Sequence, residues 1–431
     1  MILSDSERLM DLYREFEWRD MIYHATDGLQ EALTASSLTG YIGFDPTASS
    51  LHVGSLLTVM GLARLQRFGH TPLAIVGGGT GMIGDPSGKS QERLLLSAEQ
   101  VEANVAGIRG QLERFLDFDA GPHAARIVNN AEWLGTIGLL DFLRDAGKHF
   151  TVNYLLQKES VSRRLDSEEG ISFTEFSYVL LQAYDFVQLY DRFGCTLQLG
   201  GSDQWGNITA GIDLIRKVRA AKSHGLVWPL MQTASGTKFG KTEAGTVWLD
   251  PARTSPFRFY QFWLNTDDRD VLRYVKFFTF RTQQEIDAIA SSVERAPEKR
   301  EAQRTLARDV TTLVHGDDQS ARAERASAIL FGGDITHANV DDALTVFEDA
   351  PSTELRWPDE GLTVIQALVT TGLAPSKSEA MRLIKSGGVY VNNQRVADER
   401  AALDRSQAIG GKLFVLRKGQ RQNHLVKLLE A

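Results

Sequence analysis

Cysteine is almost absent from this chain of 431 residues, whose single thiol is Cys195. One cysteine excludes an internal disulfide and any metal cluster built from several thiolates. The neighbours Phe193, Leu197 and Leu199 are apolar, so we expect Cys195 to be a small packed side chain and not a nucleophile.

Long apolar runs are also lacking, since none approaches the roughly 18 residues that a membrane helix needs. The N-terminal stretch MILSDSERLMDLYREFEWRD has no basic start followed by an apolar segment, as a secretory signal would, and is too acidic for a transit peptide. With 42% hydrophobic and 24% charged residues, the composition is that of an ordinary globular chain with room for two or three domains. We therefore expect a cytoplasmic protein without membrane contact.

Negative charge is unevenly spread along the chain. Residues 361–431 hold 11 Lys or Arg against 5 Asp or Glu, a net charge of +6, which leaves −14 for residues 1–360. A basic tail on an acidic body suggests a polyanionic partner for the tail. Charge alone leaves open whether the tail binds such a partner or is simply a solvated basic surface.

Residues 39–250 alternate short apolar runs with helical patterns, which predicts an α/β domain with a Rossmann-like parallel sheet covered by helices on both faces. In such a sheet the ligand site lies at the carboxyl ends of the strands. The expected strands are 41–44, 73–76, 127–129 and 196–199, and two of the expected helices are 54–68 and 91–115.

Three further regions follow the α/β domain, which we place at 1–255. Residues 256–331 contain a single glycine, Gly316, and little proline, so we expect an all-helical domain. Residues 332–360 are acidic and weakly periodic and resemble a linker with room for a short helix. Residues 361–431 combine two helical patterns with the strand-like VYVNNQRV, which predicts a small α+β domain.

The stretch GDPSGKS, residues 84–90, looks like a phosphate-binding P-loop but has the wrong spacing. Such a loop needs two glycines five positions apart before its lysine, whereas Gly84 and Gly88 are four apart. Asp85 would also place a carboxylate beside the phosphates, where like charges repel. The acid in this glycine-rich turn therefore needs another explanation.

Two segments are suited to binding a polyphosphate. In YIGFDPTASSLHVGS, residues 41–55, a strand leads into a helix near His52; its N–H groups attract an anion, Gly54 leaves room for a ligand, and His52 and Thr47 can donate hydrogen bonds. In SGTKFGKTEAGT, residues 235–246, Lys238 and Lys241 form a double cation in a glycine-flanked loop. Taken alone, each segment is better explained by a capping or packed histidine and by a solvated basic loop; only the two together point to a polyphosphate site.

The segment ISFTEFSYVLLQAYDFVQLY predicts a buried helix with a polar row. Ser172 and Glu175 have capping-box spacing, and the helix is apolar nearly all round, including Phe173 at its start. Buried polar side chains need hydrogen-bond partners. A small polar ligand would supply them, whereas the alternative is that this face is simply wet. The row consists of Tyr178, Gln182 and Asp185.

HVGS at 52–55 and KFGKT at 238–242 resemble the two signatures of the class I aminoacyl-tRNA synthetases. The segments VGGGTGMIGDPSGKS, FLRDAGKHFTVN, GISFTEFSYVLLQAYD and LGGSDQWGNITAG are similar to those of the bacterial tyrosyl-tRNA synthetases, and this resemblance covers nearly the whole chain. The family has histidine as the fourth residue of the first signature. Here Ser55 stands in its place, which allows only a shorter hydroxyl contact with the nucleotide.

The resemblance implies that L-tyrosine is activated by ATP to tyrosyl-adenylate with release of pyrophosphate, and that the tyrosyl group is then transferred to tRNA(Tyr). It places Asp85, Tyr178 and Gln182 around the α-ammonium group, and Tyr41 and Asp185 at the phenolic hydroxyl, with Gln204 near the reacting carboxyl group. Asp85 would thus face a cation, which accounts for the acid in GDPSGKS.

The resemblance also implies a set of nucleotide and catalytic residues. Mg²⁺ is expected on the ATP phosphates, with no protein cluster dedicated to a metal. A general base is unnecessary because the tyrosine carboxylate, with a pKa of about 3.5, is already ionised. The implied ATP contacts are Asp45, His52, Gly54, Ser55, Lys89, Arg93, Gly201, Asp203, Lys238 and Lys241, and the implied catalytic residues are Thr47, His52, Lys238, Lys241 and Thr242.

The basic tail resembles an S4-like RNA-binding domain. Its candidates for tRNA phosphate contacts are Lys377, Arg382, Lys385 and Arg395, although each could equally be a solvated charge. By the same resemblance, residues 256–331 face the anticodon region and the protein is a homodimer.

Two alternatives remain. A tryptophan-specific enzyme of the same class would share the catalytic architecture, although Tyr41 and Asp185 argue against it because an indole offers one donor. An RNA-binding protein without ligase activity would keep the basic tail and lack turnover of ATP.

Overall fold

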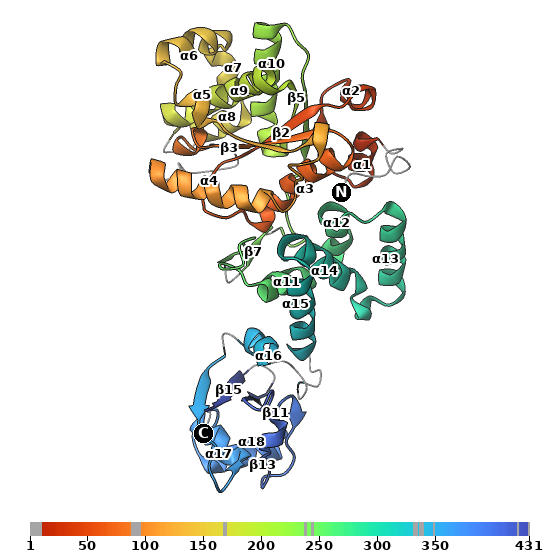
Figure 1. The fold of residues 1–431 in the computed structure, drawn as a ribbon, viewed down its shortest axis with the longest axis vertical. Helices are drawn as coiled ribbons and strands as arrows, with labels where there is room; N and C mark the ends of the chain where they lie inside the picture. Colours follow the sequence, from red (N-terminus) through yellow and green to blue (C-terminus); the bar gives the residue numbers. More distant parts are fainter. Residues whose placement is uncertain are drawn as a thin grey trace. The chain divides into compact units, whose positions relative to one another are not determined.

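The computed structural model describes residues 11–87, 96–166, 170–236, 239–242, 245–330, 335, 340–347, 350–419 and 422–429. The chain forms two compact units: residues 1–255 with 262–314, and residues 256–261 with 315–431 (Figure 1). None of the described helices is both long enough and apolar enough to cross a membrane.

A six-stranded sheet organises the first unit, in the order β1-β6-β5-β2-β3-β4. All neighbours are parallel except β1, which pairs antiparallel with β6. The α/β class and parallel sheet predicted from the sequence are thereby confirmed. The strands are β1 (His24–Ala25), β2 (Thr39–Phe44), β3 (Thr71–Val76), β4 (Arg126–Asn129), β5 (Cys195–Gly201) and β6 (His224–Trp228).

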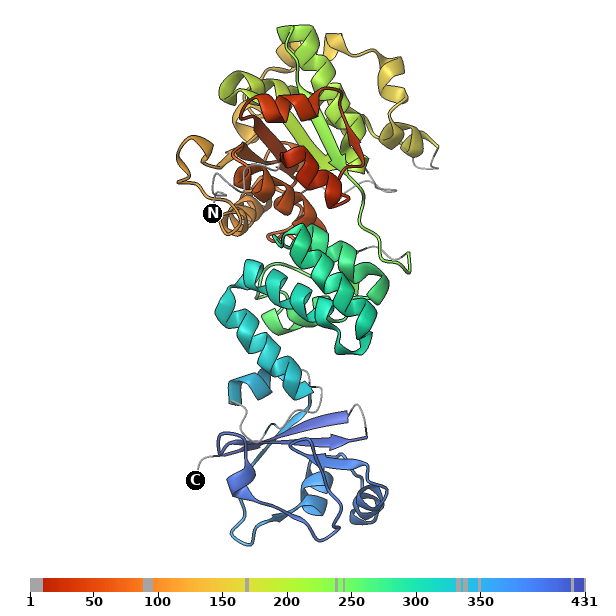
Figure 2. The same ribbon diagram turned by 90° about the vertical axis from the view of Figure 1, so that its right-hand side faces the viewer.

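Helices connect the strands and lie on both faces of the sheet, as Figure 2 shows. The helix expected at 91–115 begins at Ala98 within the described residues, where Ser97 and Gln100 form a capping box. The helices up to residue 219 are α1 (Leu12–Trp18), α2 (Leu29–Ala35), α3 (Val53–Arg67), α4 (Ala98–Leu112), α5 (Ala131–Leu134), α6 (Leu139–Asp145), α7 (Val152–Leu156), α8 (Glu159–Leu165), α9 (Phe173–Phe193) and α10 (Trp205–Arg219).

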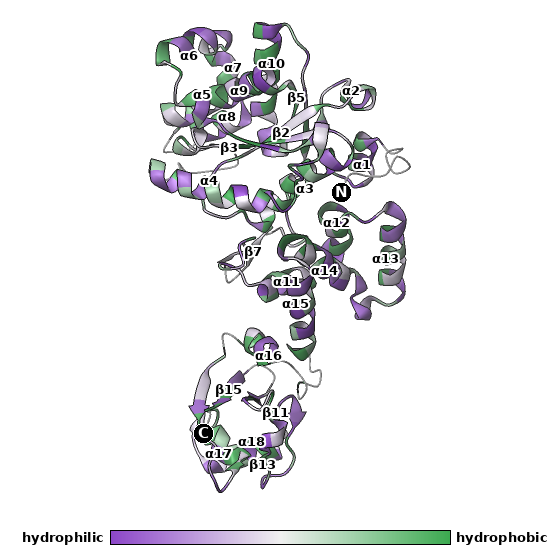
Figure 3. Ribbon diagram, viewed as in Figure 1, coloured by the Kyte–Doolittle hydropathy of each residue, from purple (hydrophilic) through white to green (hydrophobic). Residues whose placement is uncertain are grey.

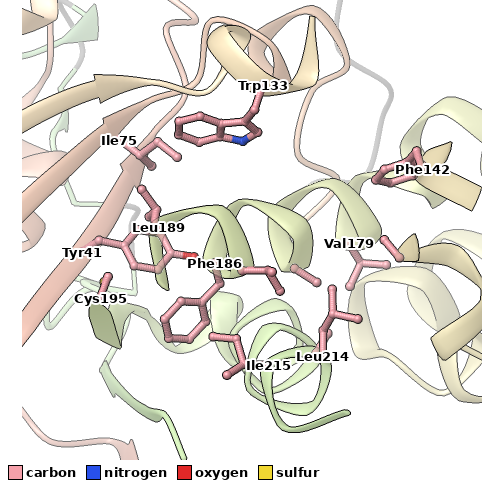
Figure 4. Close-up of a cluster of buried hydrophobic side chains, with 14 of the residues drawn as sticks. Tyr41, Ile75, Trp133, Phe142, Val179, Phe186, Leu189, Cys195, Leu214 and Ile215 are labelled. Atoms are coloured by element: carbon pink, nitrogen blue, oxygen red, sulfur yellow. The ribbon is translucent and has the colours of Figure 1, made fainter. Parts of the chain in front are cut away.

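The core of this unit forms where α9 and α10 pack on the sheet. Figure 4 shows part of this cluster, which includes Phe186 of α9, Ile215 of α10 and Cys195 of β5. Cys195 is fully buried, and burial raises the pKa of its thiol to about 12, so its predicted role as a packed side chain is confirmed.

Within this unit, two buried arginines join the helices of residues 262–314 to the part that holds the sheet. Arg19 Nη1 donates to the Lys276 carbonyl at 2.6 Å, and Arg64 Nη2 donates to the Thr279 carbonyl at 2.7 Å. Cations are favourable at the carboxyl end of a helix, here the end of α12. The short strands and helices of this region are β7 (Lys241–Thr242), β8 (Gly245–Thr246), α11 (Pro256–Leu264), α12 (Asp268–Phe278), α13 (Gln283–Arg295) and α14 (Glu301–His315).

The second unit contains a five-stranded sheet in the order β12-β11-β14-β15-β9, and a two-stranded pair of β10 and β13. Helices α17 and α18, which match the two helical patterns expected in the tail, pack through a hydrophobic cluster on one face of the larger sheet. The elements are α15 (Asp317–Leu330), α16 (Val340–Val346), β9 (Ser352–Leu355), β10 (Leu362–Thr363), α17 (Val364–Thr370), α18 (Lys377–Lys385), β11 (Val389–Val391), β12 (Gln394–Arg395), β13 (Ala402–Leu403), β14 (Leu413–Lys418) and β15 (Gln422–Leu428).

Candidate active site

A cavity of about 340 Å³ opens at the carboxyl ends of β2, β3, β5 and β6, the edge of the sheet where the sequence predicts a ligand. It holds four carboxylates and, among its described lining residues, no lysine, arginine or histidine. Such a site suits a cation better than a phosphate group. The predicted residues that line it are Tyr41, Asp45, Thr47, Gly54, Ser55, Asp85, Tyr178, Gln182, Asp185, Gly201, Asp203 and Gln204.

Helix α9 brings one wall of the cavity. Ser172 accepts a hydrogen bond from the Glu175 backbone N–H at 3.2 Å, and the Glu175 carboxylate pairs with Arg164 at 2.9 Å, both side chains being buried. The row at 178, 182 and 185 then faces the cavity, as the spacing predicts. The prediction of burial is wrong at the start of the helix, where Phe173 is 80% exposed because no described element covers the first turn.

Asp185 lies at the inner end of the cavity and is held by two donors. Trp133 Nε1 donates to its Oδ1 at 2.6 Å, and Asn130 Nδ2 donates to its Oδ2 at 2.9 Å. Burial raises the pKa of Asp185 to about 7, with the negative charge of Asp45 acting in the same direction, although the hydrogen bonds from Asn130 and Trp133 lower it.

Tyr41 lines the same inner end and carries a buried hydroxyl for which no described residue is a hydrogen-bond partner. Burial, and secondarily the charge of Asp185, raises the pKa of Tyr41, so its hydroxyl stays neutral and able to donate. Buried hydroxyls without a partner are uncommon in native proteins. Tyr41 and Asp185 together thus offer a donor and an acceptor to a ligand hydroxyl.

A chain of hydrogen bonds links four side chains at the cavity: Asp85, Gln204, Gln182 and Asn207. Gln204 Nε2 donates to Asp85 Oδ2 at 2.7 Å, Gln182 Nε2 donates to Gln204 Oε1 at 3.2 Å, and Asn207 Nδ2 donates to Gln182 Oε1 at 2.9 Å. Each amide is thereby fixed in one orientation. Asp85 also accepts the Ser87 backbone N–H at 2.9 Å, so this carboxylate closes its own turn and faces the cavity.

Tyr178 is held by Asp45. Its hydroxyl donates to Asp45 Oδ2 at 2.9 Å, and Thr80 Oγ1 donates to Asp45 Oδ1 at 3.1 Å. Burial, followed by the charge of Asp45, raises the pKa of Tyr178, which keeps this hydroxyl protonated. Asp45, expected as a nucleotide contact, is in this structure the acceptor that orients Tyr178.

The first signature lies at the start of α3, next to the cavity. His52 precedes the helix and its ring lies 6.1 Å from that of Trp248. A Cβ added at Gly54 would stand 2.7 Å from His52 Cε1, closer than real Cβ contacts allow. An alanine here would therefore displace the imidazole from its place against the helix backbone.

Several predicted residues cannot be placed with the others. Lys89, Arg93 and Lys238 lie outside the described residues, and of Lys241 and Thr242 only the backbone, in β7, is described. The four tail candidates belong to the second unit, where all are exposed. Arg382 pairs with Glu379 at 3.4 Å and Lys385 with Glu399 at 3.2 Å.

Sequence reasoning missed four residues that position the site. Asn130 and Trp133 follow β4 directly, and the rule that ligand residues come just after parallel strands would have flagged the stretch NNAEW. Thr80 and Asn207 also follow parallel strands, β3 and β5, but turns and helix starts commonly contain these residue types, so they did not stand out. Within the described residues, no group of three His, Cys, Asp or Glu side chains could hold a metal ion.

Comparison with known proteins agrees with the geometry. The family described as tRNA synthetases class I (W and Y) matches residues 34–332, and a tyrosine–tRNA ligase C-terminal domain matches residues 342–426. Tyrosine–tRNA ligase of Roseiflexus castenholzii is 56% identical over 96% of this chain and 99% of its own length. The chain belongs to the tyrosine–tRNA ligases.

Other members of the family agree. The Geobacillus stearothermophilus enzyme is 51% identical over 97% of this chain and all of its own length. A truncated mitochondrial tyrosyl-tRNA synthetase of Aspergillus nidulans superposes with a TM-score of 0.67 at 31% identity, covering 74% of this chain and 94% of that structure. The resemblance read from the signatures is thus confirmed.

Proposed function

We propose that this protein joins L-tyrosine to tRNA(Tyr) in two steps at the cavity of the first unit. The observation that carries the proposal is the buried hydroxyl of Tyr41, left without a described partner beside the hydrogen-bonded carboxylate of Asp185. A phenolic hydroxyl placed between them would accept from Tyr41 and donate to Asp185. An indole N–H could satisfy only the carboxylate.

The ammonium group of the substrate occupies the middle of the cavity in this proposal. Asp85 supplies the negative charge, and Tyr178 and Gln182 lie along the same wall. The hydrogen bonds that these side chains make with Asp45 and Gln204 hold them in place before the substrate arrives. Preorganised partners of this kind lower the entropic cost of binding.

In the first step an oxygen of the tyrosine carboxylate attacks the α-phosphorus of ATP. A new P–O bond forms while the bond to the bridging oxygen breaks, and pyrophosphate leaves with the electron pair. The carboxylate needs no general base, since its pKa of about 3.5 leaves it ionised. Catalysis then depends on alignment and on neutralising the phosphate charge.

ATP enters as its Mg²⁺ complex, with the metal as part of the substrate. Ser55 and Gly54 at the start of α3 and Asp203 after β5 line the cavity on the side assigned to the nucleotide. The described cavity lining has no lysine or arginine. We therefore assign the neutralising charge to Lys89 and Arg93, in and just after the segment 84–90, and to Lys238 and Lys241 of the segment 235–246. Further nucleotide contacts are Thr47, His52, Thr242 and Gly201.

In the second step a terminal ribose hydroxyl of tRNA attacks the carbonyl carbon of tyrosyl-adenylate, and AMP leaves. Exposed basic residues of the second unit hold the tRNA through its phosphates, with Lys377, Arg382, Lys385 and Arg395 as the candidates named from the sequence. We place this reaction in the cytoplasm, with its tRNA substrate.

Amino-acid-dependent exchange of pyrophosphate into ATP tests the first step. Tyrosine should support exchange while tryptophan and phenylalanine support far less. Exchange with tryptophan alone would overturn the assignment. Removal of residues 361–431 should abolish tRNA binding and leave exchange intact, whereas a full chain that binds tRNA but exchanges with no amino acid would be an RNA-binding protein without ligase activity.

We also propose a homodimer formed through an apolar surface around α6 to α9. Seven large hydrophobic side chains are exposed there, among them Leu140 and Phe173, each at 80%. In Figure 3 the ribbon of α6, at the rim of this unit, carries both hydrophobic and hydrophilic residues. The surface consists of Leu139, Leu140, Leu143, Val152, Leu156, Leu165 and Phe173.

Exposed apolar clusters of this kind mark interaction sites. Leu140→Asp should shift the sedimenting species from dimer to monomer, while Tyr23→Asp, a change at an exposed side chain outside this surface, should not. A wild-type chain that sediments as a monomer at micromolar concentration would refute the dimer.

A further inference from the structure

Four side chains lie in one row across the sheet of the second unit. Tyr390 on β11 is directly opposite Arg395 on β12 and Arg417 on β14, and Arg417 is directly opposite Asn423 on β15. Directly opposed residues of antiparallel strands project from the same face of a sheet. With strands spaced about 4.8 Å apart, the row is about 14 Å long. We call these four residues the basic row.

The basic row lies on the face of the sheet opposite to α17 and α18. Val389 and Val391, the neighbours of Tyr390, point to the other face and join the hydrophobic cluster with those helices. On the face of the basic row, Val415 and Leu425 are buried in a cluster with α16. Arg417 and Asn423 of the row lie two residues from them on β14 and β15. Figure 2 shows that α16 covers only part of the sheet. The residues of the basic row are half-buried or exposed.

The Arg417 guanidinium is held by two contacts, and the Arg395 guanidinium lies close over a glycine. The Arg417 guanidinium carbon lies 3.8 Å from the centroid of the Tyr390 ring, and its Nη1 donates to the Gly419 carbonyl at 3.2 Å. The Arg395 guanidinium lies directly over Gly387, where any Cβ would collide with it. Groups that are already ordered lose less entropy when a ligand binds.

The two arginines also differ from the cations of α18 in their charge partners. Within the described part of the chain, neither Arg395 nor Arg417 forms an ion pair, whereas Arg382 and Lys385 are paired with Glu379 and Glu399. Guanidinium groups without an ion-pair partner, one of them held against an aromatic ring, are suited to a ligand that offers both phosphates and a flat π-surface.

We propose that the basic row binds an unpaired nucleotide of tRNA, with its base stacked on the Tyr390–Arg417 pair and the adjacent phosphates held by Arg395 and Arg417. The proposal rests on the proposed function, because it takes tRNA as the ligand. Unpaired bases stacked on aromatic side chains of an open sheet are a recurrent mode of RNA recognition. Base-paired RNA would meet only the two charges, so the row favours a loop, bulge or chain end.

Equilibrium binding of tRNA(Tyr) at several salt concentrations tests the basic row with single variants of the full chain. Arg417→Gln should weaken binding and lower the slope of log K against log salt by about 1, whereas Arg417→Lys should keep the slope. Tyr390→Ala should weaken binding about 5- to 150-fold through lost stacking, and Tyr390→Phe should bind as the wild type does. Arg405→Gln, an exposed charge in the same unit that lies on none of the strands of the row, should change neither the slope nor the affinity.

Tyrosine-dependent pyrophosphate exchange and thermal midpoints equal to the wild type will show that the variants are folded. Wild-type affinity and slope in both Arg417→Gln and Tyr390→Ala would overturn the proposed role of the basic row, although the chain would still bind tRNA. A wild-type protein that exchanges pyrophosphate but binds no tRNA would instead refute the proposed second step. If Tyr390→Ala lost as much affinity for a blunt-ended, fully paired RNA duplex as for tRNA, stacking of an unpaired base would be refuted.

Discussion

The cavity of the first unit concentrates four carboxylates among its described lining residues, whereas the basic row of the second unit presents two arginines on an open sheet. In the cavity, burial makes each charge expensive unless it is hydrogen-bonded, so Asp185 and Asp45 each have two donors. On the row, Arg395 is exposed and Arg417 is half-buried, so ligand contacts there are sensitive to salt. The cavity therefore fits the small molecule, and the row the polyanion, that we propose as their ligands.

Removing the carboxylate of Asp185 should change selectivity more than any other substitution in the cavity. Sites that hydrogen-bond a substrate hydroxyl discriminate by about 10⁴- to 10⁵-fold, a range for which tyrosyl-tRNA synthetases are themselves the standard example. We expect Asp185→Ala to lower the ratio of kcat/KM for tyrosine over phenylalanine by at least about 100-fold in pyrophosphate exchange, mainly through tyrosine. An unchanged ratio would mean that Asp185 does not recognise the phenolic hydroxyl of the substrate.

Burial of Asp185 also predicts a pH dependence of stability that no exposed charge of the row should have. Its pKa is about 7 in the folded chain against an ordinary value of 3.8, so between these values the folded state holds more protons than the unfolded state. The free energy of unfolding must then fall as pH rises through this window. Relative to Asp185→Ala, the wild type should lose about 2 kcal/mol between pH 5 and pH 8 in denaturant titrations. Parallel curves for the two proteins would contradict the raised pKa.

Trp133→Phe keeps the aromatic ring and removes the 2.6 Å hydrogen bond to Asp185. Hydrogen bonds to charged groups contribute about 1.5–3 kcal/mol, so the KM for tyrosine should rise about tenfold or more. The KM for phenylalanine should change little. The Trp133 hydrogen bond lowers the pKa of Asp185, so its loss raises that pKa. As pH falls, the KM for tyrosine should therefore begin to rise at a higher pH in the variant than in the wild type. A purely structural role would raise both KM values together.

The smallest effect is expected at Gly54, where an added methyl group displaces the His52 ring. Gly54→Ala should lower kcat for pyrophosphate exchange several-fold with little change in the KM for tyrosine, because misalignment at the nucleotide side affects the reaction and not amino-acid selection. Gly110→Ala is the matched control, since nothing lies within 4 Å of an added Cβ there. That change should leave activity intact and favour helix α4 by up to about 1 kcal/mol.

Much of the cavity could be read from the sequence because it depends on local geometry. The spacing of Tyr178, Gln182 and Asp185 along one helix places them on one side of it, whatever the rest of the fold does. Glycine and polar residues just after apolar runs predicted the loops at the carboxyl ends of β2, β3 and β5, where Asp45 and Asp85 line the cavity. The two signatures and the segments around them identified the family.

The hydrogen-bond partners of these residues could not be read in the same way. Asp185 meets Asn130 and Trp133 only because β4 lies beside β3 in the sheet and α9 packs across them. The exposure of Phe173 likewise depends on which elements reach the first turn of α9. The spacing of apolar residues indicates which face of a helix tends to be buried, but not which elements of the fold cover that face.

By itself, the sequence determined the α/β class, the family and many of the side chains that line the cavity, since these follow from periodicity, signature motifs and residue chemistry. Tertiary structure alone decided which donors hold Asp185, which hydroxyl is left for the ligand, and that Arg395, Tyr390 and Arg417 share one face of a sheet. Strand order and register bring together residues far apart in the chain, and a shift of one residue in register would turn every side chain of a strand to the opposite face.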